Sequence, residues 1–190
     1  NAVVRIESIK SHLQALPWKG VVFLSVGIVF LGWLLNARPG LLGKADAVGY
    51  AVCHRIEVRS FKIAGRTLPM CARCSGMYLA AILGLAYQGV FSRRKGGLPP
   101  RQIQVVLGLF ILAFAVDGIN SFASLIPGFP TLYEPQNWLR LLTGSGMGLA
   151  VAAFLYPAFN QTVWRDWDPR PALNNFKMLL GLVILTALLD

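Results

Sequence analysis

Long apolar segments separated by polar connections constrain this chain more than any other feature of its sequence. Residues 20–36 read GVVFLSVGIVFLGWLLN and carry no charge, and four further apolar segments follow. A transmembrane helix needs roughly 20 mainly apolar residues, so segments of this kind suit a bilayer. The sequence therefore predicts an all-α, polytopic helical membrane protein with about five transmembrane helices. The expected spans are residues 20–36, 74–91, 103–126, 138–159 and 176–190.

The charge content agrees with a membrane location. Only 14% of the residues are charged, against about 25% in an ordinary soluble domain. The net charge of +10 suits basic residues that flank membrane helices and contact anionic head groups. No recognisable nucleic-acid module interrupts the spans, so we expect the lipid bilayer as partner, possible further membrane protein subunits, and no nucleic acid.

The segments between the spans suggest the domain organisation. Residues 1–19 form a basic amphipathic N-terminal segment, and residues 20–190 form a single membrane domain. Residues 37–76 join the first two spans and are far longer than a tight helical hairpin needs; residues 41–52 within them suit a short interfacial helix. The sequence has no initial Met and is still apolar near residue 190, so we expect at least one end to be missing. The basic run at 93–95 favours an N-terminus inside, which places the 37–76 loop outside.

All three cysteines and one of the two histidines lie in the stretch CHRIEVRSFKIAGRTLPMCARCSG, residues 53–76. Cys71 and Cys74 form a C-x-x-C pair, whose two sulfurs can converge on one ion. With Cys53 and His54 they make a Cys₃His set, which is typical of tetrahedral zinc sites. Adjacent residues point in different directions, so Cys53 and His54 need not both bind. If one of them does not bind the ion, the ion keeps an open coordination position, which is the arrangement of catalytic zinc.

Two other interpretations of the cysteines stay open. The C-x-x-C pair also suits a disulfide or dithiol redox chemistry, although an odd number of cysteines leaves one without a partner. In the second interpretation, the three thiols are free and bind no ligand. Among metals, zinc is favoured over an iron–sulfur cluster, because most clusters need four thiolates. A c-type haem is disfavoured because Ser75, and not a histidine, follows Cys74.

The same stretch resembles a known family signature. CHR at 53–55, RSF at 59–61, Gly65, Pro69 and CARCSGMY at 71–78 are similar to the pattern of a family of small prokaryotic membrane proteins classified as a domain of unknown function. Asp117-Gly118 and N-x-L-R-L-L-T-G at 137–144 extend the resemblance, which covers roughly residues 45–150. Arg55 and Glu57-Val58 depart from the family pattern, where Gln and Pro-Glu are common, but the four candidate ligands are intact. The resemblance implies a multi-span protein of the prokaryotic plasma (inner) membrane with a Cys/His site. It does not indicate what activity such a protein has.

Two charged residues fall inside expected spans. Asp117 lies in the third span and Arg140 in the first turn of the fourth. A carboxylate in hydrocarbon must face the bundle interior, stay protonated or meet a cation. Arg140 is the obvious partner, but Asp117 is placed deeper in its span, so a direct pair stays open. A structural contact between two helices and a proton or substrate site both remain open. Gly144 and Gly148 form a G-x-x-x-G pattern that predicts close helix packing within the chain.

Basic residues crowd around the candidate ligands, with only Glu57 opposing them. They suit an anionic substrate or a lipid phosphate, and they equally suit head-group contact by a loop on the bilayer surface. The residues expected to contact an anion or lipid head group are Arg55, Arg59, Arg66 and Arg73.

Three classes of function remain. The first is a membrane protein whose metal site staples the surface loop, serving as an accessory or interaction subunit of a membrane assembly. The second is a metal-dependent membrane enzyme acting on a lipid-linked or anionic substrate, with Glu57 or Asp117 as base. The third is a thiol–disulfide redox protein using Cys71 and Cys74. A channel or transporter is disfavoured, because one buried acid and no pair of broken helices offer little for an inverted repeat.

Overall fold

A computed structural model describes residues 18–189, so the expected N-terminal segment lies almost wholly outside the described residues. Six α-helices account for most of the described chain, which confirms the all-α membrane architecture. The chain divides into two compact units, residues 1–48 and 49–190.

The first unit consists of α2 (Trp18–Asn36) and most of α3 (Leu41–Val52). A turn with Gly40 at a φ of +83° separates them, and the two helices are bent by 115°. The Lys44 ammonium donates to the carbonyl of Leu34 at 2.9 Å. It thereby satisfies one of the backbone acceptors that a helix C-terminus leaves without an internal partner.

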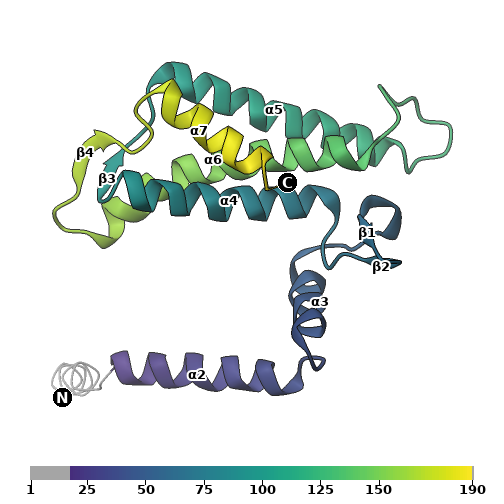
Figure 1. Ribbon diagram of the computed structural model, residues 1–190, viewed down its shortest axis with the longest axis horizontal. Helices are drawn as coiled ribbons and strands as arrows, with labels where there is room; N and C mark the ends of the chain where they lie inside the picture. Colours follow the sequence, from purple (N-terminus) through teal and green to yellow (C-terminus); the bar gives the residue numbers. More distant parts are fainter. Residues whose placement is uncertain (1–17, 190) are drawn as a thin grey trace, which may run out of the picture. The chain divides into compact units, whose positions relative to one another are not determined.

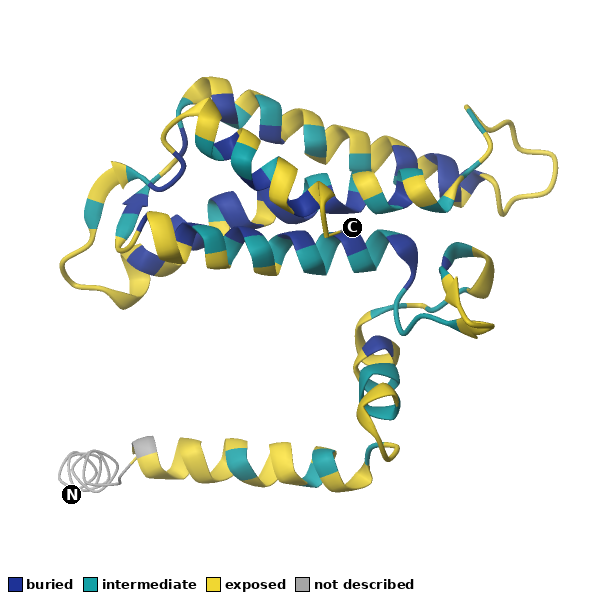
Figure 2. Ribbon diagram, viewed as in Figure 1, coloured by how far each residue is buried: buried dark blue, intermediate teal, exposed yellow. Residues whose placement is uncertain are grey.

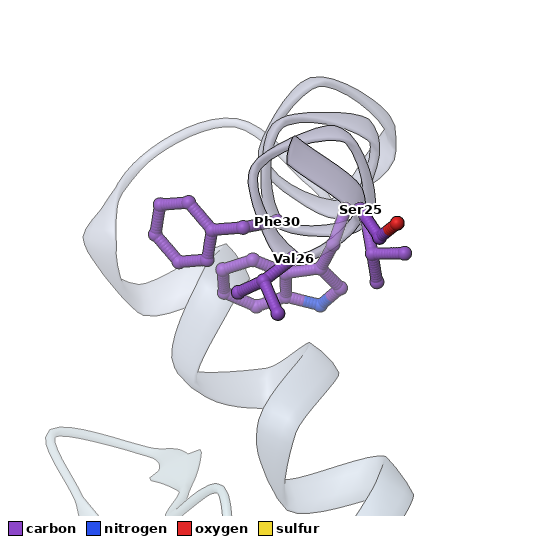
Figure 3. Close-up of a pocket in the computed structure, with 5 residues that line it drawn as sticks. Ser25, Val26 and Phe30 are labelled. Carbon is purple, nitrogen blue, oxygen red and sulfur yellow. The ribbon is translucent and has the colours of Figure 1, made fainter. Parts of the chain in front are cut away.

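Among the side chains of α2 that the structure describes, none is buried, and Figure 2 shows the helix mostly in the colour of exposed residues. Phe23, for example, is 77% exposed. A shallow hollow of about 530 Å³ lies on this helix, lined by Val29, Trp33 and the labelled residues of Figure 3, Ser25, Val26 and Phe30. An apolar surface of this extent suits lipid tails better than water.

The second unit is a bundle whose helices run alongside one another in Figure 1. The bundle consists of α4 (Ala72–Phe91), α5 (Arg101–Ala123), α6 (Asn137–Val163) and α7 (Phe176–Ala187). These helices form most of its apolar core, with buried residues such as Ala80, Leu107, Leu149 and Leu182.

Small residues let α4 and α6 make the most extensive helix contact of the bundle. A Cβ placed on Gly144 would collide with the backbone of Arg73, and one on Gly148 would collide with the backbone of Met77. On the facing helix, a Cβ on Gly76 would collide with the backbone oxygen of Leu141. The G-x-x-x-G pattern therefore packs within the chain, as expected.

Short strands, which the hydropathy pattern did not predict, organise both ends of the bundle. At one end, β1 (Lys62–Ile63) and β2 (Arg66–Thr67) pair antiparallel after the 3₁₀ turn η1 (Glu57–Arg59). At the other, β3 (Lys95–Gly97) and β4 (Asp168–Pro171) pair in parallel.

Three described helices, α4, α5 and α6, are long and apolar enough to cross a membrane. The bent pair of α2 and α3 would make a fourth span if it counts as one broken span. The α7 helix has 12 residues, which is short for a bilayer. The structure thus supports three to four spans, and the expected total of five stays a prediction.

Candidate functional site

The three cysteines meet where the 53–71 loop begins and ends. Cys53 follows α3, Cys71 is the N-cap residue of α4, and Cys74 lies in the first turn of α4. Their Sγ atoms all lie within 4.8 Å of one another. Cys71 is buried, and the other two are partly buried. A group of this kind can hold a metal ion.

Backbone N–H groups point at the sulfur of Cys53. The N–H of Arg55 donates to Sγ at 3.5 Å and the N–H of Cys71 donates at 3.2 Å. Arg55 has a φ of +49°, and this left-handed conformation belongs to the tight turn that brings its N–H back to the sulfur. Such donors stabilise a thiolate and orient it as a ligand.

The pKa of Cys71 is lowered from 9.0 to about 5. The main cause is a hydrogen bond from the Cys74 thiol, with smaller contributions from Cys53 and from the charge of His54; burial opposes the shift. The thiolate is the form that binds metals, so Cys71 is held in the protonation state that a metal needs. The same hydrogen bond raises the pKa of Cys74, whose thiol must lose its proton when a metal binds.

His54 is exposed, and its ring nitrogens are not among the atoms of the cysteine group. The structure thus brings together three of the four expected ligands and leaves His54 beside them. Its role as a ligand stays a prediction.

Local turns hold the loop between the cysteines in one conformation. Ala64 and Gly65, the two central residues of the β1–β2 turn, have φ of +48° and +76°, as the type I′ turns of tight hairpins require. The N–H of Leu68 donates to the carbonyl of Phe61 at 2.9 Å. In the last turns of α3, just before the loop, a Cβ on Gly49 would collide with the carbonyl of Pro69. The loop is therefore packed close to its own ends.

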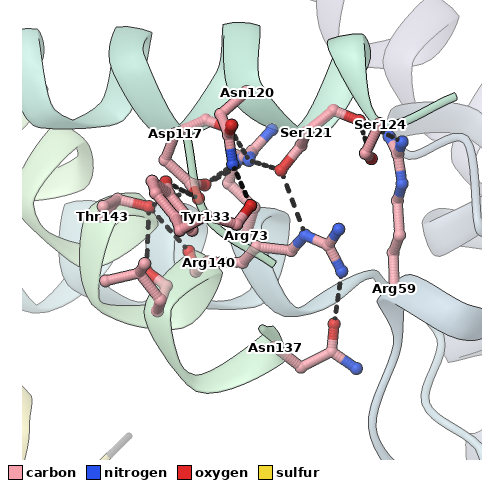
Figure 4. Close-up of polar contacts among 11 residues, drawn as sticks. Arg59, Arg73, Asp117, Asn120, Ser121, Ser124, Tyr133, Asn137, Arg140 and Thr143 are labelled. Atoms are coloured by element: carbon pink, nitrogen blue, oxygen red, sulfur yellow. Dashed lines mark hydrogen bonds and ion pairs between the residues drawn. The ribbon is translucent and has the colours of Figure 1, made fainter. Parts of the chain in front are cut away.

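Next to the cysteines lies a polar network centred on Asp117 of α5 (Figure 4). The Arg73 guanidinium forms an ion pair with the Asp117 carboxylate and donates a further hydrogen bond to it through Nε at 3.1 Å. The Tyr133 hydroxyl donates to the same carboxylate at 2.7 Å, and the Thr143 hydroxyl donates at 3.2 Å. Asp117 is therefore buried, and three side chains contact its carboxylate.

The sequence left a direct pair between Asp117 and Arg140 open, and the structure pairs Asp117 with Arg73 instead. Arg140 is buried, but it donates to Ser121 Oγ at 3.4 Å and to Asn137 Oδ1 at 2.8 Å. Arg73, from the C-x-x-C segment, takes the carboxylate. The reason is that α4 and α5 both pack on α6, and Arg73 in the first turn of α4 reaches the carboxylate of α5.

The four arginines expected to contact an anion have different positions. Arg73 is committed to Asp117 and also lies over the Phe114 ring, 5.6 Å from its centre. Arg59 is partly buried and donates to the backbone oxygen of Ser121 at 2.7 Å. Arg66 is exposed on β2, and Arg55 is partly buried beside Cys53. Their contact with a head group stays a prediction.

Sequence reasoning found part of the network and missed two of its members. Asn120 and Ser121 follow Asp117 on one face of α5, and their spacing already extends its polar face. Tyr133 and Thr143 were missed: nothing in the local sequence marks Tyr133, which lies in the connection after α5, and Thr143 belongs to the 137–144 motif of the family resemblance, which gives it no role. Asn120 holds this connection in place, because its side chain donates to the carbonyl of Tyr133 and accepts from the N–H of Leu132.

Replacing Tyr133 with phenylalanine should make stability less sensitive to alkaline pH. Burial and the hydrogen bond to Asp117 raise the pKa of Tyr133 from 10.0 to about 12. The neutral phenol is thus favoured in the folded state, and its stabilisation is present below pH 10 and lost between pH 10 and 12. Thermal unfolding in detergent across this range should show a smaller decline for Tyr133→Phe. At pH 7 the variant should lose about 1 kcal/mol. The matched control is Tyr50→Phe, since Tyr50 is 81% exposed; an equal response of the two variants would contradict the assignment.

Comparisons with known proteins agree with these features. The family model described as "Predicted membrane protein (DUF2085)" matches residues 53–154, which include the cysteines, Asp117 and Arg140. An uncharacterized protein of Methanocaldococcus jannaschii is 26% identical over 146 residues, 77% of this chain and 88% of that protein. An uncharacterized protein of Methanothermobacter thermautotrophicus is 32% identical over 102 residues, 53% of this chain and 82% of that protein. No solved structure matches the chain. The family expected from the cysteine motif is confirmed, and the chain belongs to the DUF2085 family of membrane proteins.

Proposed function

We propose that Cys53, Cys71 and Cys74 bind a zinc ion that fastens the 53–71 loop to the start of α4. The observation that carries the proposal is the convergence of three sulfurs from the two ends of that loop. A metal bridging them would fix the loop beside the polar network. The protein would act as an accessory or interaction subunit of a membrane assembly, in the prokaryotic plasma membrane.

The donor set fits zinc. Tetrahedral zinc with Zn–S distances of about 2.3 Å separates its sulfurs by roughly 3.8 Å, and the three Sγ atoms lie within 4.8 Å of one another. Soft thiolates favour zinc over magnesium or calcium. The fourth position would be taken by His54, if its ring turns toward the sulfurs, or by a ligand from outside the chain.

The surroundings of the site favour a structural role over catalysis. Glu57 and Asp117 are the carboxylates that could act as a base. Glu57 is paired with Lys62 at 2.5 Å, and hydrogen bonding to that lysine lowers the pKa of Glu57. Asp117 is occupied by Arg73, Tyr133 and Thr143. A metal-dependent enzyme remains the second candidate, because three cysteines without His54 would leave the open position that catalytic zinc uses.

The basic end of the bundle supports an orientation with the cysteine site outside. Seven basic residues lie in or next to the connections at the β3–β4 end, and positive residues favour the cytoplasmic side. They are Arg93, Arg94, Lys95, Arg101, Arg165, Arg170 and Lys177.

Elemental analysis of the detergent-purified protein tests the proposal. We expect about one zinc per chain, and thiols that react only after a strong chelator is added. Cys53→Ser, Cys71→Ser and Cys74→Ser should each lose the zinc, whereas the control Ser75→Ala should keep it. Zinc retained in His54→Ala would indicate an open fourth position and favour the enzyme.

The contrary result is equally specific. No metal, with one reactive thiol per chain, would overturn the zinc site and indicate a Cys71–Cys74 disulfide. The thiol–disulfide redox function would then take its place.

A further inference from the structure

Three guanidinium groups converge on one residue, Ser121 of α5. Arg73 and Arg140 donate to its hydroxyl oxygen at 3.0 Å and 3.4 Å, and Arg59 donates to its backbone oxygen at 2.7 Å. Ser121 is fully buried. The three arginines come from η1, α4 and α6, so the tertiary fold assembles them (Figure 4).

The three arginines carry more positive charge than the neighbouring carboxylate can offset. Within residues 18–189, the only carboxylate that forms an ion pair with any of the three is that of Asp117, and its partner is Arg73. Arg59 and Arg140 are left as two positive charges that act on each other. A zinc ion with three thiolates carries one negative charge and would still leave an excess of one.

An uncompensated guanidinium pair is costly away from water. Arg140 is only 6% exposed, and burial of a charge is unfavourable unless an opposite charge and hydrogen bonds offset it. Asn137 and Ser121 supply neutral acceptors to Arg140 and no charge. Arg59 is partly exposed, so this side of the pair is accessible to a ligand from outside.

We propose that Arg59 and Arg140 form a binding site for a phosphate group, at the end of the bundle that carries the cysteines. A phosphate offers several oxygens in the geometry that guanidinium forks match, and its charge would offset the excess. Arg73 is not part of this site, because Asp117 already neutralises it. The proposal does not depend on the metal, since the charge excess exists with or without zinc.

Both arginines lie near helix ends, so a phosphate could reach them either from a lipid head group or from solution. Arg140 is the fourth residue of α6, and Arg59 lies in the loop before α4. A phospholipid head group and a soluble phosphate ester or free phosphate share the chemistry. Two binding measurements separate them: calorimetry with inorganic phosphate against chloride at equal ionic strength, and native mass spectrometry of lipid retained from nanodiscs of mixed phosphatidylglycerol and phosphatidylcholine.

The variants are Arg59→Gln and Arg140→Gln, with Arg101→Gln as the matched control. Arg101 is an exposed arginine at the opposite end of α5. We expect each of the first two variants to weaken binding about tenfold, because each loses charge-assisted hydrogen bonds. Arg140→Lys should keep part of the binding, since it keeps the charge and loses the fork. Arg59 lies in the loop and not in a helix of the bundle, so Arg59→Gln tests the site even if Arg140→Gln does not fold.

Each outcome decides the proposal. If Arg59→Gln and Arg140→Gln lose the binding of inorganic phosphate that the unaltered protein shows, the ligand is a soluble one. If they lose only the retention of phosphatidylglycerol, the ligand is a lipid head group. Absence of both kinds of binding in the unaltered protein overturns the site. So does an equal loss in Arg101→Gln, or unchanged binding in both Arg59→Gln and Arg140→Gln. Zinc measured in the same samples shows whether the metal site has failed separately.

Discussion

Replacing Asp117 with asparagine is expected to lower the free energy of unfolding by about 3 kcal/mol, because it leaves a largely buried arginine without its counter-charge. The side chains of Arg73 and Asp117 are only 17% and 2% exposed. The same substitution weakens the hydrogen bonds that Tyr133 and Thr143 donate to the carboxylate. Reversible unfolding in mixed detergent micelles measures the loss.

The matched control is Asp168→Asn. Asp168 pairs with Arg170 at 2.7 Å, but Arg170 is 77% exposed, so the loss should be much smaller than that of Asp117→Asn, because water screens an exposed ion pair. Removing both partners in Arg73→Met/Asp117→Leu should cost less than Asp117→Asn alone, since no unpaired charge remains. Equal losses for Asp117→Asn and Asp168→Asn would contradict a buried pair.

Replacing Gly148 with leucine should destabilise the bundle by about 3 kcal/mol. A Cβ there would collide with the carbonyl of Met77 and with Ala80 and Ala81 on α4. Backbone cannot turn aside as a flexible side chain can, so α4 and α6 would have to separate. The same unfolding measurement applies, with the cysteine thiols as a second readout, because α4 carries Cys71 at its start and Cys74 in its first turn.

Gly108→Leu is the control for this substitution. Gly108 also lies inside a long apolar helix, but nothing stands within 4 Å of a Cβ placed on it. Its replacement should be neutral or slightly stabilising, because leucine is the better helix former. If the two variants unfold alike, the α4–α6 contact is not the close backbone packing described here.

The helices could be predicted because their signal is local. Uncharged runs such as residues 20–36 are expensive to expose to water, and a helix satisfies the backbone within the segment itself. The short helix expected at 41–52 is α3, Leu41–Val52. The length of α7 and the bend between α2 and α3 were not predictable, because hydropathy does not report where an apolar segment turns.

The candidate metal ligands were predictable for a related reason. C-x-x-C is a local spacing, and the loop back to Cys53 is short enough to close. The distinction between Cys53 and His54 needed the fold. The positive φ of Arg55 and the N–H groups of Arg55 and Cys71 direct the Cys53 sulfur toward the cluster, and no local pattern specifies that turn.

By itself, the sequence determined an all-α membrane protein, its family, and a cysteine cluster at the start of a helix, because apolar length and ligand spacing act within one segment. The tertiary structure decided which charges meet. By sequence, Arg140 was the only arginine considered as a partner of Asp117, and the close packing of α4 on α6 gives the carboxylate to Arg73 instead. That choice leaves Arg59 and Arg140 together around Ser121. Charge balance at a buried site depends on distances between helices, and those distances are set by packing.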